Sequence, residues 1–110
     1  MARGIAWGDI RFVDFGRPDK RRPALVLTRT SAVPYLNAVT VAPITRTIRG
    51  VPTEVSLGTE EGMKDVCAAN LHTLQTVSAK RIGRYLGSIS AARKTELRRA
   101  LLFALELDGT

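Results

Sequence analysis

The fold of this chain is decided by the segment Arg22-Pro23-Ala24-Leu25-Val26-Leu27 and, after a polar loop, by the segment Ala38-Val39-Thr40-Val41-Ala42-Pro43-Ile44-Thr45. The first is a nearly continuous apolar run, which is typical of a strand buried on both faces. The second is also predicted to be a strand. Pro43 indicates an edge or a bulge near its end, because proline cannot donate a hydrogen bond to a neighbouring strand. Basic residues precede the first strand, and hydroxyl groups and an arginine end the second, so chemistry is expected at these two ends.

Shorter strand-like segments surround this pair. Residues 7–15 alternate so that neither face is wholly polar, which predicts a curved and largely buried strand. Further strands are expected at residues 53–57, 65–71, 73–77 and 84–89, of which the middle two form one long strand or a bent pair. Residues 90–107 have helical spacing, with Ser90 as the N-cap. The pattern predicts one domain, residues 1–110, that is mainly β: a small, strongly bent antiparallel barrel or half-barrel with a C-terminal helix as cover.

The composition favours a polyanionic partner. The net charge of +7 points to nucleic acid first and to an anionic membrane surface second, and a basic protein with no such partner is the alternative. The single cysteine, Cys67, excludes an internal disulfide and fits a reducing cytoplasm. It lies in an apolar run and is interpreted as a small buried side chain rather than a nucleophile. Residues 1–10 lack the apolar region of a signal peptide, and the longest apolar run, residues 100–105, is too short to span a bilayer.

Few residue types are available for catalysis. One histidine and one cysteine exclude both a metal site rich in those ligands and a two-histidine ribonuclease mechanism, and His72 is predicted to be structural or exposed. Arginine and threonine at the strand ends suffice if the substrate is RNA, because RNA supplies its own nucleophile, the 2′-OH. A guanidinium and a hydroxyl can stabilise the charge that builds on the phosphoryl oxygens, whereas arginine is a poor general base. The alternative is that Arg21, Arg22 and Arg46 only bind phosphates.

Five segments in order resemble the MazF/PemK family, also called Kid-type toxins, of bacterial type II toxin–antitoxin systems. Residues 7–15 are similar to the family's opening strand, 22–27 to its Arg-Pro strand, and 39–45 to its strand ending in Pro-Ile-Thr. Residues 52–55 and 75–83 are similar to the two segments that follow. No single motif is specific, but five in order across the chain are, and the sequence is most similar to the basic toxins of the mycobacterial type.

The resemblance implies an SH3-like barrel with a C-terminal helix that forms a homodimer. Members are metal-independent endoribonucleases without a cofactor, and they cleave single-stranded RNA at short sequences. Attack by the 2′-OH leaves a 2′,3′-cyclic phosphate and a 5′-OH. Such a toxin inhibits translation and growth in the cytoplasm, with no membrane partner. An acidic, partly disordered antitoxin is expected to cover the same basic groove as the RNA.

Residue roles carry over from the family by position. Its catalytic arginine, which precedes the proline of the second strand, corresponds to Arg22, and its catalytic threonine, which ends the third strand, corresponds to Thr45. The RNA path is expected to be lined by Arg21, Arg46, Thr47 and Gln75. Two features depart from the family's pattern: the loop at residues 17–21 is shorter, more basic and lacks the family's glutamate, and Gln75 stands where many members have arginine.

Two alternatives from other functional classes stay open. The CcdB toxins, which bind and inhibit gyrase, resemble this family in fold, and fold does not determine function. A gyrase-binding toxin would not need the pair Arg22 and Thr45. The second alternative is a barrel that binds RNA without cleaving it, which incubation with pure RNA in the absence of metal would distinguish from a nuclease.

Overall fold

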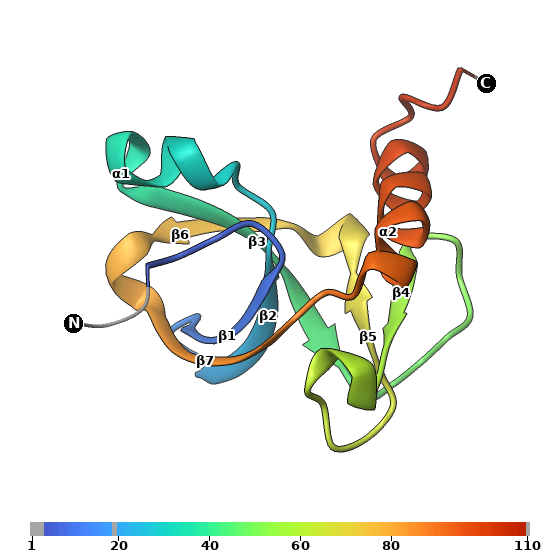
Figure 1. Ribbon diagram of the computed structural model, residues 1–110, viewed down its shortest axis with the longest axis horizontal. Coiled ribbons are helices and arrows are strands. Elements are labelled where there is room, and N and C mark those ends of the chain that lie inside the picture. Colours follow the sequence, from blue (N-terminus) through green and yellow to red (C-terminus); the bar gives the residue numbers. More distant parts are fainter. Residues whose placement is uncertain (1–3, 19, 110) are drawn as a thin grey trace.

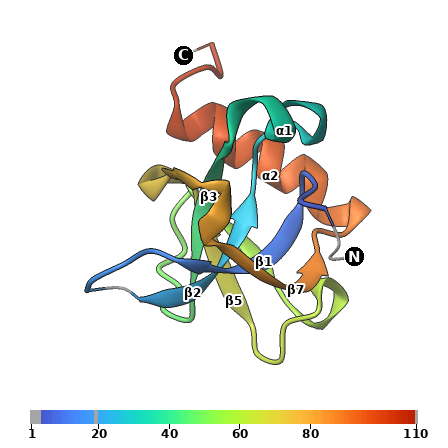
Figure 2. The ribbon, with the colours of Figure 1, turned by 90° about the vertical axis from the view of Figure 1, so that its left-hand side faces the viewer.

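The computed structural model describes residues 4–18 and 20–109, and its centre is a strongly curved antiparallel sheet (Figures 1 and 2). The strands are β1 (Asp9–Asp14), β2 (Arg21–Val26), β3 (Ala38–Thr45), β4 (Glu54–Leu57), β5 (Cys67–Asn70), β6 (Gln75–Ser78) and β7 (Ile82–Ser88). The helices are α1 (Val33–Leu36) and α2 (Ala91–Ala104), and short 3₁₀ turns are η1 (Thr30–Ala32), η2 (Thr59–Glu61), η3 (Leu71–Thr73) and η4 (Ala79–Arg81). The strand order is β4-β5-β3-β2-β1-β7, with β6 paired to β3. The predicted fold class, a mainly β half-barrel with a C-terminal helix, is confirmed.

The segments 22–27 and 38–45, which contain most of β2 and all of β3, form the middle of the sheet. Side chains of β2 and β3 enter two apolar clusters, because successive residues of a strand point to opposite faces. Leu25 and Ile44 belong to the cluster beneath α2, which also takes side chains from β4 and β5. Val26 and Val41 belong to the second cluster, which α1 and β6 border. The prediction of a β2 strand buried on both faces is therefore confirmed.

The end of β3 is not an edge, and that part of the prediction from Pro43 is wrong. β3 pairs with β6 through Val41 and then with β5 from Ile44 onward. Pro43 falls in the short interval between these two partners, while its other flank pairs with Ala24 of β2. A missing N–H is tolerated where the strand passes from one neighbour to the next.

The predicted bent pair at residues 65–77 is confirmed as β5, η3 and β6. The Asn70 side chain accepts a hydrogen bond from His72 N at 3.3 Å, which caps η3 at the bend. The bend lets β5 and β6 meet different halves of β3. It therefore brings residues 72–75 beside the end of β3 and the chain that follows it.

β1 is largely buried, as predicted, and it contains a buried ion pair. Arg11 is 7% exposed and Asp9 is 1% exposed. Arg11 Nη1 lies 3.1 Å from Asp9 Oδ2, and Arg11 Nε donates to the carbonyl oxygen of Gly83 at 2.8 Å. Gly83 lies in β7. This guanidinium therefore links β1 to β7 in addition to the backbone hydrogen bonds between the two strands.

In residues 58–66, which connect β4 to β5, Glu61 and Gly62 pack tightly on β7. Glu61 is 1% exposed, its Oε1 accepts from Gly58 N at 2.8 Å, and its Oε2 lies 3.8 Å from Arg93 Nε of α2. A methyl group added at Gly87 would overlap the carbonyl oxygen of Glu61. A sequence this polar predicts an open loop, yet the segment is held by a buried carboxylate and by backbone contact at Gly87.

Gly87→Ala is expected to lower the free energy of unfolding by about 1–3 kcal/mol, as overpacking typically does. The new methyl group must push residues 61–62 away from β7. Urea unfolding followed by circular dichroism measures the change. Gly58→Ala is the matched control, because a methyl group there meets nothing within 4 Å. Equal stability of the two variants would contradict the tight contact.

Helix α2 begins after Ser90, as predicted, but the Ser90 hydroxyl makes no capping hydrogen bond within the described part of the chain. The helix ends at Ala104 rather than at residue 107. Glu106 takes a left-handed φ of 56°, and Leu107 N donates to Leu102 O at 2.7 Å, which closes the helix early. No helix within residues 4–18 and 20–109 is long and apolar enough to cross a membrane.

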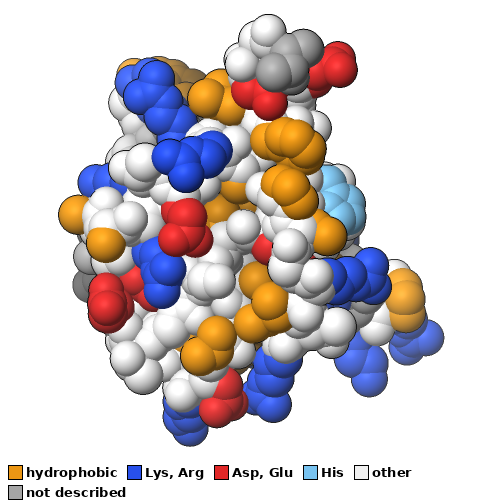
Figure 3. All heavy atoms as spheres, turned by 90° about the vertical axis from the view of Figure 1, so that its right-hand side faces the viewer, with side chains coloured by type: hydrophobic (Ala, Val, Ile, Leu, Met, Phe, Trp, Pro, Cys, Tyr) orange, Lys and Arg blue, Asp and Glu red, His pale blue; other side chains and the backbone are white. Residues whose placement is uncertain are grey.

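The end of α2 carries exposed apolar side chains. Phe103 and Leu105 are each 50% exposed and Leu107 is 66% exposed. Figure 3 shows the face with α2 and the C-terminal end, where a band of hydrophobic side chains runs between basic ones. Such a surface is suited to contact with another chain.

Candidate functional site

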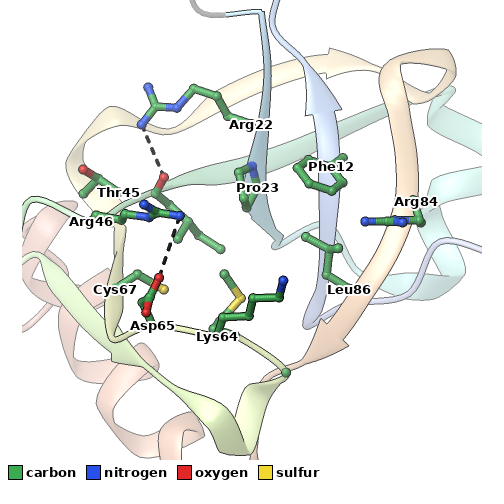
Figure 4. A pocket seen from close by; sticks show the side chains of 13 residues that line it. Phe12, Arg22, Pro23, Thr45, Arg46, Lys64, Asp65, Cys67, Arg84 and Leu86 are labelled. Carbon is green, nitrogen blue, oxygen red and sulfur yellow. Dashed lines mark hydrogen bonds and ion pairs between the residues drawn. The ribbon is translucent and has the colours of Figure 1, made fainter.

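Arg22 and Thr45 lie side by side and line two adjacent pockets (Figure 4). The first pocket has a volume of about 510 Å³ and lies between the ends of β2 and β3, residues 62–67 and β7. The second pocket has a volume of about 390 Å³ and lies between β3, residues 47–54 and residues 70–75. The pair therefore stands at the boundary between two hollows.

Backbone contacts hold both side chains in place. Arg22 Nη2 donates to the carbonyl oxygen of Ile44 at 3.3 Å, which keeps the guanidinium over the end of β3. Thr45 is the last residue of β3, and its Oγ1 accepts from Thr47 N at 3.0 Å. Because the Thr45 oxygen is used as an acceptor in this bond, its hydroxyl hydrogen remains available to a ligand.

The other predicted site residues divide between the pockets. Arg46 lines the first pocket and lies 3.8 Å from Asp65, but both side chains are exposed, so this ion pair restrains Arg46 little. Thr47 and Gln75 line the second pocket. Arg21 lines neither, and instead its guanidinium lies 5.7 Å from the centre of the Phe12 ring.

The first pocket is strongly basic. It is lined by four cationic side chains and one carboxylate, Arg22, Arg46, Lys64, Arg84 and Asp65. Figure 4 shows Arg22, Thr45 and Arg46 on one side of the pocket and Phe12 and Arg84 on the other. A cluster of this sign favours an anionic ligand.

The second pocket holds a carboxylate and an imidazole, Glu54 and His72, beside the arginines Arg22 and Arg49. Glu54 accepts hydrogen bonds from Arg49 N at 3.1 Å and from Gly50 N at 2.9 Å, and so fixes the turn that follows Thr47. His72 Nδ1 lies 2.8 Å from Thr53 Oγ1, which orients the imidazole. The prediction that His72 is exposed is confirmed, but the ring also lines a pocket that contains Arg22 and Thr45.

Several pocket residues were not predicted. Phe12 was expected inside a buried strand, and Lys64 and Arg84 carried no signal that set them apart from other surface cations. Their place in the site depends on the pairing of β1 with β7 and on the packing of residues 58–66, which join distant parts of the chain. The place of Glu54 and His72 in the second pocket similarly depends on the pairing of β4 with β5.

Cys67 lines the first pocket but is 3% exposed. Burial, followed by the nearby Glu61 carboxylate, raises the pKa of the Cys67 thiol above its ordinary value. The thiol therefore stays protonated near neutral pH and is a poor nucleophile, which agrees with its interpretation as a small buried side chain. Among the residues that the structure describes, no group of three or more His, Cys, Asp or Glu side chains is placed to hold a metal ion.

The fold and the site together define a class of protein: small curled barrels that bring an arginine and a threonine together at the ends of neighbouring strands. Comparison with known proteins identifies the family. The profile of the "PemK-like, MazF-like toxin of type II toxin-antitoxin system" matches residues 6–105, and the chain belongs to this family. The resemblance stated from the sequence motifs is thereby confirmed.

Mycobacterial toxins are among its relatives. Endoribonuclease MazF3 of Mycobacterium tuberculosis is 36% identical over 99 residues, which cover 90% of this chain and 96% of the relative. The solved structure of the M. tuberculosis toxin MazF-mt6 has a TM-score of 0.84 at 36% identity and covers 91% of this chain and 98% of that one. An endoribonuclease from a mycobacterial species, solved in complex with its cognate antitoxin, shares the fold with a TM-score of 0.85 at 23% identity, and the match covers 97% of this chain and all of that one. The predicted similarity to toxins of the mycobacterial type is confirmed.

Proposed function

We propose that residues 1–110 form one toxin domain that acts as a sequence-specific endoribonuclease, with Arg22 and Thr45 as its catalytic residues. The observation that carries this proposal is that both side chains line both pockets. An extended single strand of RNA that passes from one pocket to the other must cross the pair. The phosphate at the crossing would then meet a guanidinium and a hydroxyl donor.

The proposed reaction uses the substrate's own nucleophile. The 2′-OH loses its proton and attacks the adjacent phosphorus, the bond from phosphorus to the 5′-oxygen breaks, and that oxygen gains a proton. Arg22 stabilises the charge on the phosphoryl oxygens, and the Thr45 hydroxyl donates to one of them. Of the groups in the second pocket, Glu54 and His72 are the candidates for proton transfer.

The proposal is tested by incubating the protein with a long synthetic RNA in EDTA and mapping the fragment ends. We expect cuts at one short sequence, with 5′-OH ends and 2′,3′-cyclic phosphates. RNA that is bound but never cut would favour the passive RNA-binding barrel. RNA that is neither bound nor cut would favour a toxin directed at a protein such as gyrase.

Thr45→Val is expected to lower the cleavage rate by about 10- to 100-fold, because a hydrogen bond to a charged group contributes about 1.5–3 kcal/mol. Valine keeps the shape of threonine and removes its hydroxyl, which is both the proposed donor to the phosphate and the acceptor from Thr47 N. Single-turnover cleavage of one short RNA measures the effect. Thr95→Val, on the exposed face of α2, is the matched control and should cut at the wild-type rate. A Thr45→Val protein as active as the control would remove Thr45 from the mechanism.

Partners follow from the charge and from the family. We propose single-stranded RNA as the substrate and an acidic antitoxin as the inhibitor. The basic first pocket supports both, because an extended acidic peptide and RNA are attracted by the same cations. Antitoxin and RNA should therefore compete, and added salt should weaken the binding of each. The exposed apolar end of α2 supports the proposed homodimer, and the cytoplasm is the proposed site of action.

A further inference from the structure

We propose that Phe12, with Arg21 and Arg84, forms a stacking platform for one nucleobase beside the cleaved phosphate, and that this platform sets the base preference at that position. We call these three residues the Phe12 platform. The inference rests on the proposed ribonuclease function and adds to it a place where the sequence of the RNA is read.

The Phe12 platform is an aromatic ring with two guanidinium groups close to it. The guanidinium carbon of Arg21 lies 5.7 Å from the centre of the Phe12 ring, and that of Arg84 lies 5.4 Å away. Phe12 is in β1, and the two arginines come from the strands on either side of it, β2 and β7. Three adjacent strands thus bring their side chains to one spot on the sheet.

Phe12 is not used as core packing. Among the described residues, neither apolar cluster includes it, whereas its neighbours Ile10 and Val13 are fully buried core members. Its ring instead lines the first pocket and a shallow hollow of about 410 Å³ that Arg21 and Arg84 also line. A partly exposed aromatic ring that shares a hollow with two cations indicates a ligand surface rather than a structural one.

The chemistry of the Phe12 platform matches a nucleobase. Every base has a π-face that stacks on an aromatic ring, and guanidinium planes stack on bases as well. Both arginines also attract the phosphates on either side of a stacked base. Figure 4 shows Phe12 and Arg84 across the first pocket from Arg22 and Thr45, so a base on the platform belongs to a nucleotide near the cleaved bond.

The first experiment compares Phe12→Ala with Phe12→Trp on a set of RNAs in which each position around the cut carries each of the four bases. Because loss of one stacked base typically costs about 1–3 kcal/mol, Phe12→Ala should cut the preferred RNA about 5- to 100-fold more slowly. Phe12→Ala should cut RNAs with any of the four bases at similar rates at one position only. Phe12→Trp should keep the wild-type base preference at that position. Tyr35→Ala is the control, because Tyr35 is an aromatic side chain that is 86% exposed and lines none of these hollows. Unchanged base preference in Phe12→Ala would overturn the inference and leave the ribonuclease proposal intact.

A second experiment does not depend on cleavage. In a Trp7→Phe background, Phe12→Trp places the only tryptophan on the platform, since Trp7 is the single native one. A short RNA with a 2′-deoxy sugar at the cut cannot be cleaved, and it should quench the fluorescence of this tryptophan. The same oligomer with an abasic site at the stacked position should not. Circular dichroism confirms that the variant is folded.

The two experiments separate the two proposals. If the wild-type protein cuts no RNA, the ribonuclease proposal fails. A base-stacking site would still be supported if the oligomer with all its bases quenched the fluorescence and the abasic oligomer did not. Absence of quenching in a folded variant that binds the oligomer overturns the stacking inference. So does a Phe12→Ala protein that loses affinity for an acidic peptide while its base preference stays unchanged, because the ring would then serve a protein partner.

Discussion

Arg22→Ala is expected to lower the rate of RNA cleavage by about 100- to 1000-fold, the loss typical of one removed donor to a developing anionic charge. Arg22 is placed by its bond to the carbonyl oxygen of Ile44, beside the Thr45 hydroxyl, where the two pockets meet. Arg46 is exposed and lies 3.8 Å from Asp65, so it is not held over the end of β3 as Arg22 is. Single-turnover cleavage with saturating protein measures the chemical step apart from binding.

Two further variants make this experiment specific. Arg22→Lys keeps the charge but loses the planar pair of donors, so it should recover only part of the activity. Arg98→Ala removes an exposed arginine of α2 and should cut normally, which separates a local effect from loss of net charge. Thermal unfolding checks that each variant is folded. Cleavage by Arg22→Ala at the rate of Arg98→Ala would rule out the proposed role of Arg22.

Arg11→Met is expected to lower the free energy of unfolding by about 3–5 kcal/mol, the usual effect of removing one partner from a buried ion pair. Methionine retains the apolar stem but leaves the buried carboxylate of Asp9 without the guanidinium that lies 3.1 Å from it. The bond to the carbonyl oxygen of Gly83 is lost as well. A domain of this size is generally stable by about 5–15 kcal/mol, so the loss is a large fraction of the total.

Urea unfolding of four proteins measures this pair: the wild type, Arg11→Met, Asp9→Asn and the double variant. Asparagine keeps an oxygen that can accept from Ala6 N and removes the charge. The double variant should therefore be more stable than Arg11→Met alone, since it no longer buries a carboxylate that has lost the guanidinium of Arg11. If the loss of unfolding free energy in the double variant equalled the sum of the losses in the two single variants, the pair would not be coupled.

The central strands could be predicted because their signal is local. The apolar run of β2 and the proline that follows Ala42 in β3 are visible in any short window of the sequence. The partners of β3 could not be predicted in the same way. The exchange from β6 to β5 at Pro43 depends on a bend near Asn70, which is remote in sequence.

In the candidate site too, residues within local motifs could be predicted, and residues placed by distant strand pairing could not. Arg22 and Thr45 were predicted because Arg22 begins one recognisable strand motif and Thr45 ends another, and the structure brings them together. Arg84 could not be assigned, because its place beside Phe12 follows from a pairing between β1 and β7 that contains two irregular steps in register. The burial of Glu61 could not be predicted either, since a glutamate in a polar segment gives no sign that it will be buried.

The connection from β4 to β5 has two parts with different roles: one part packs on β7 and the other lines the first pocket. Glu61 and Gly62 hold the segment against Gly87, whereas residues 63–65 line the first pocket, and Lys64 and Asp65 are exposed there. Change in the exposed part costs little packing energy, because the anchor lies elsewhere. Substitution of Lys64 or Asp65 should therefore alter the lining of the first pocket while the barrel keeps its packing.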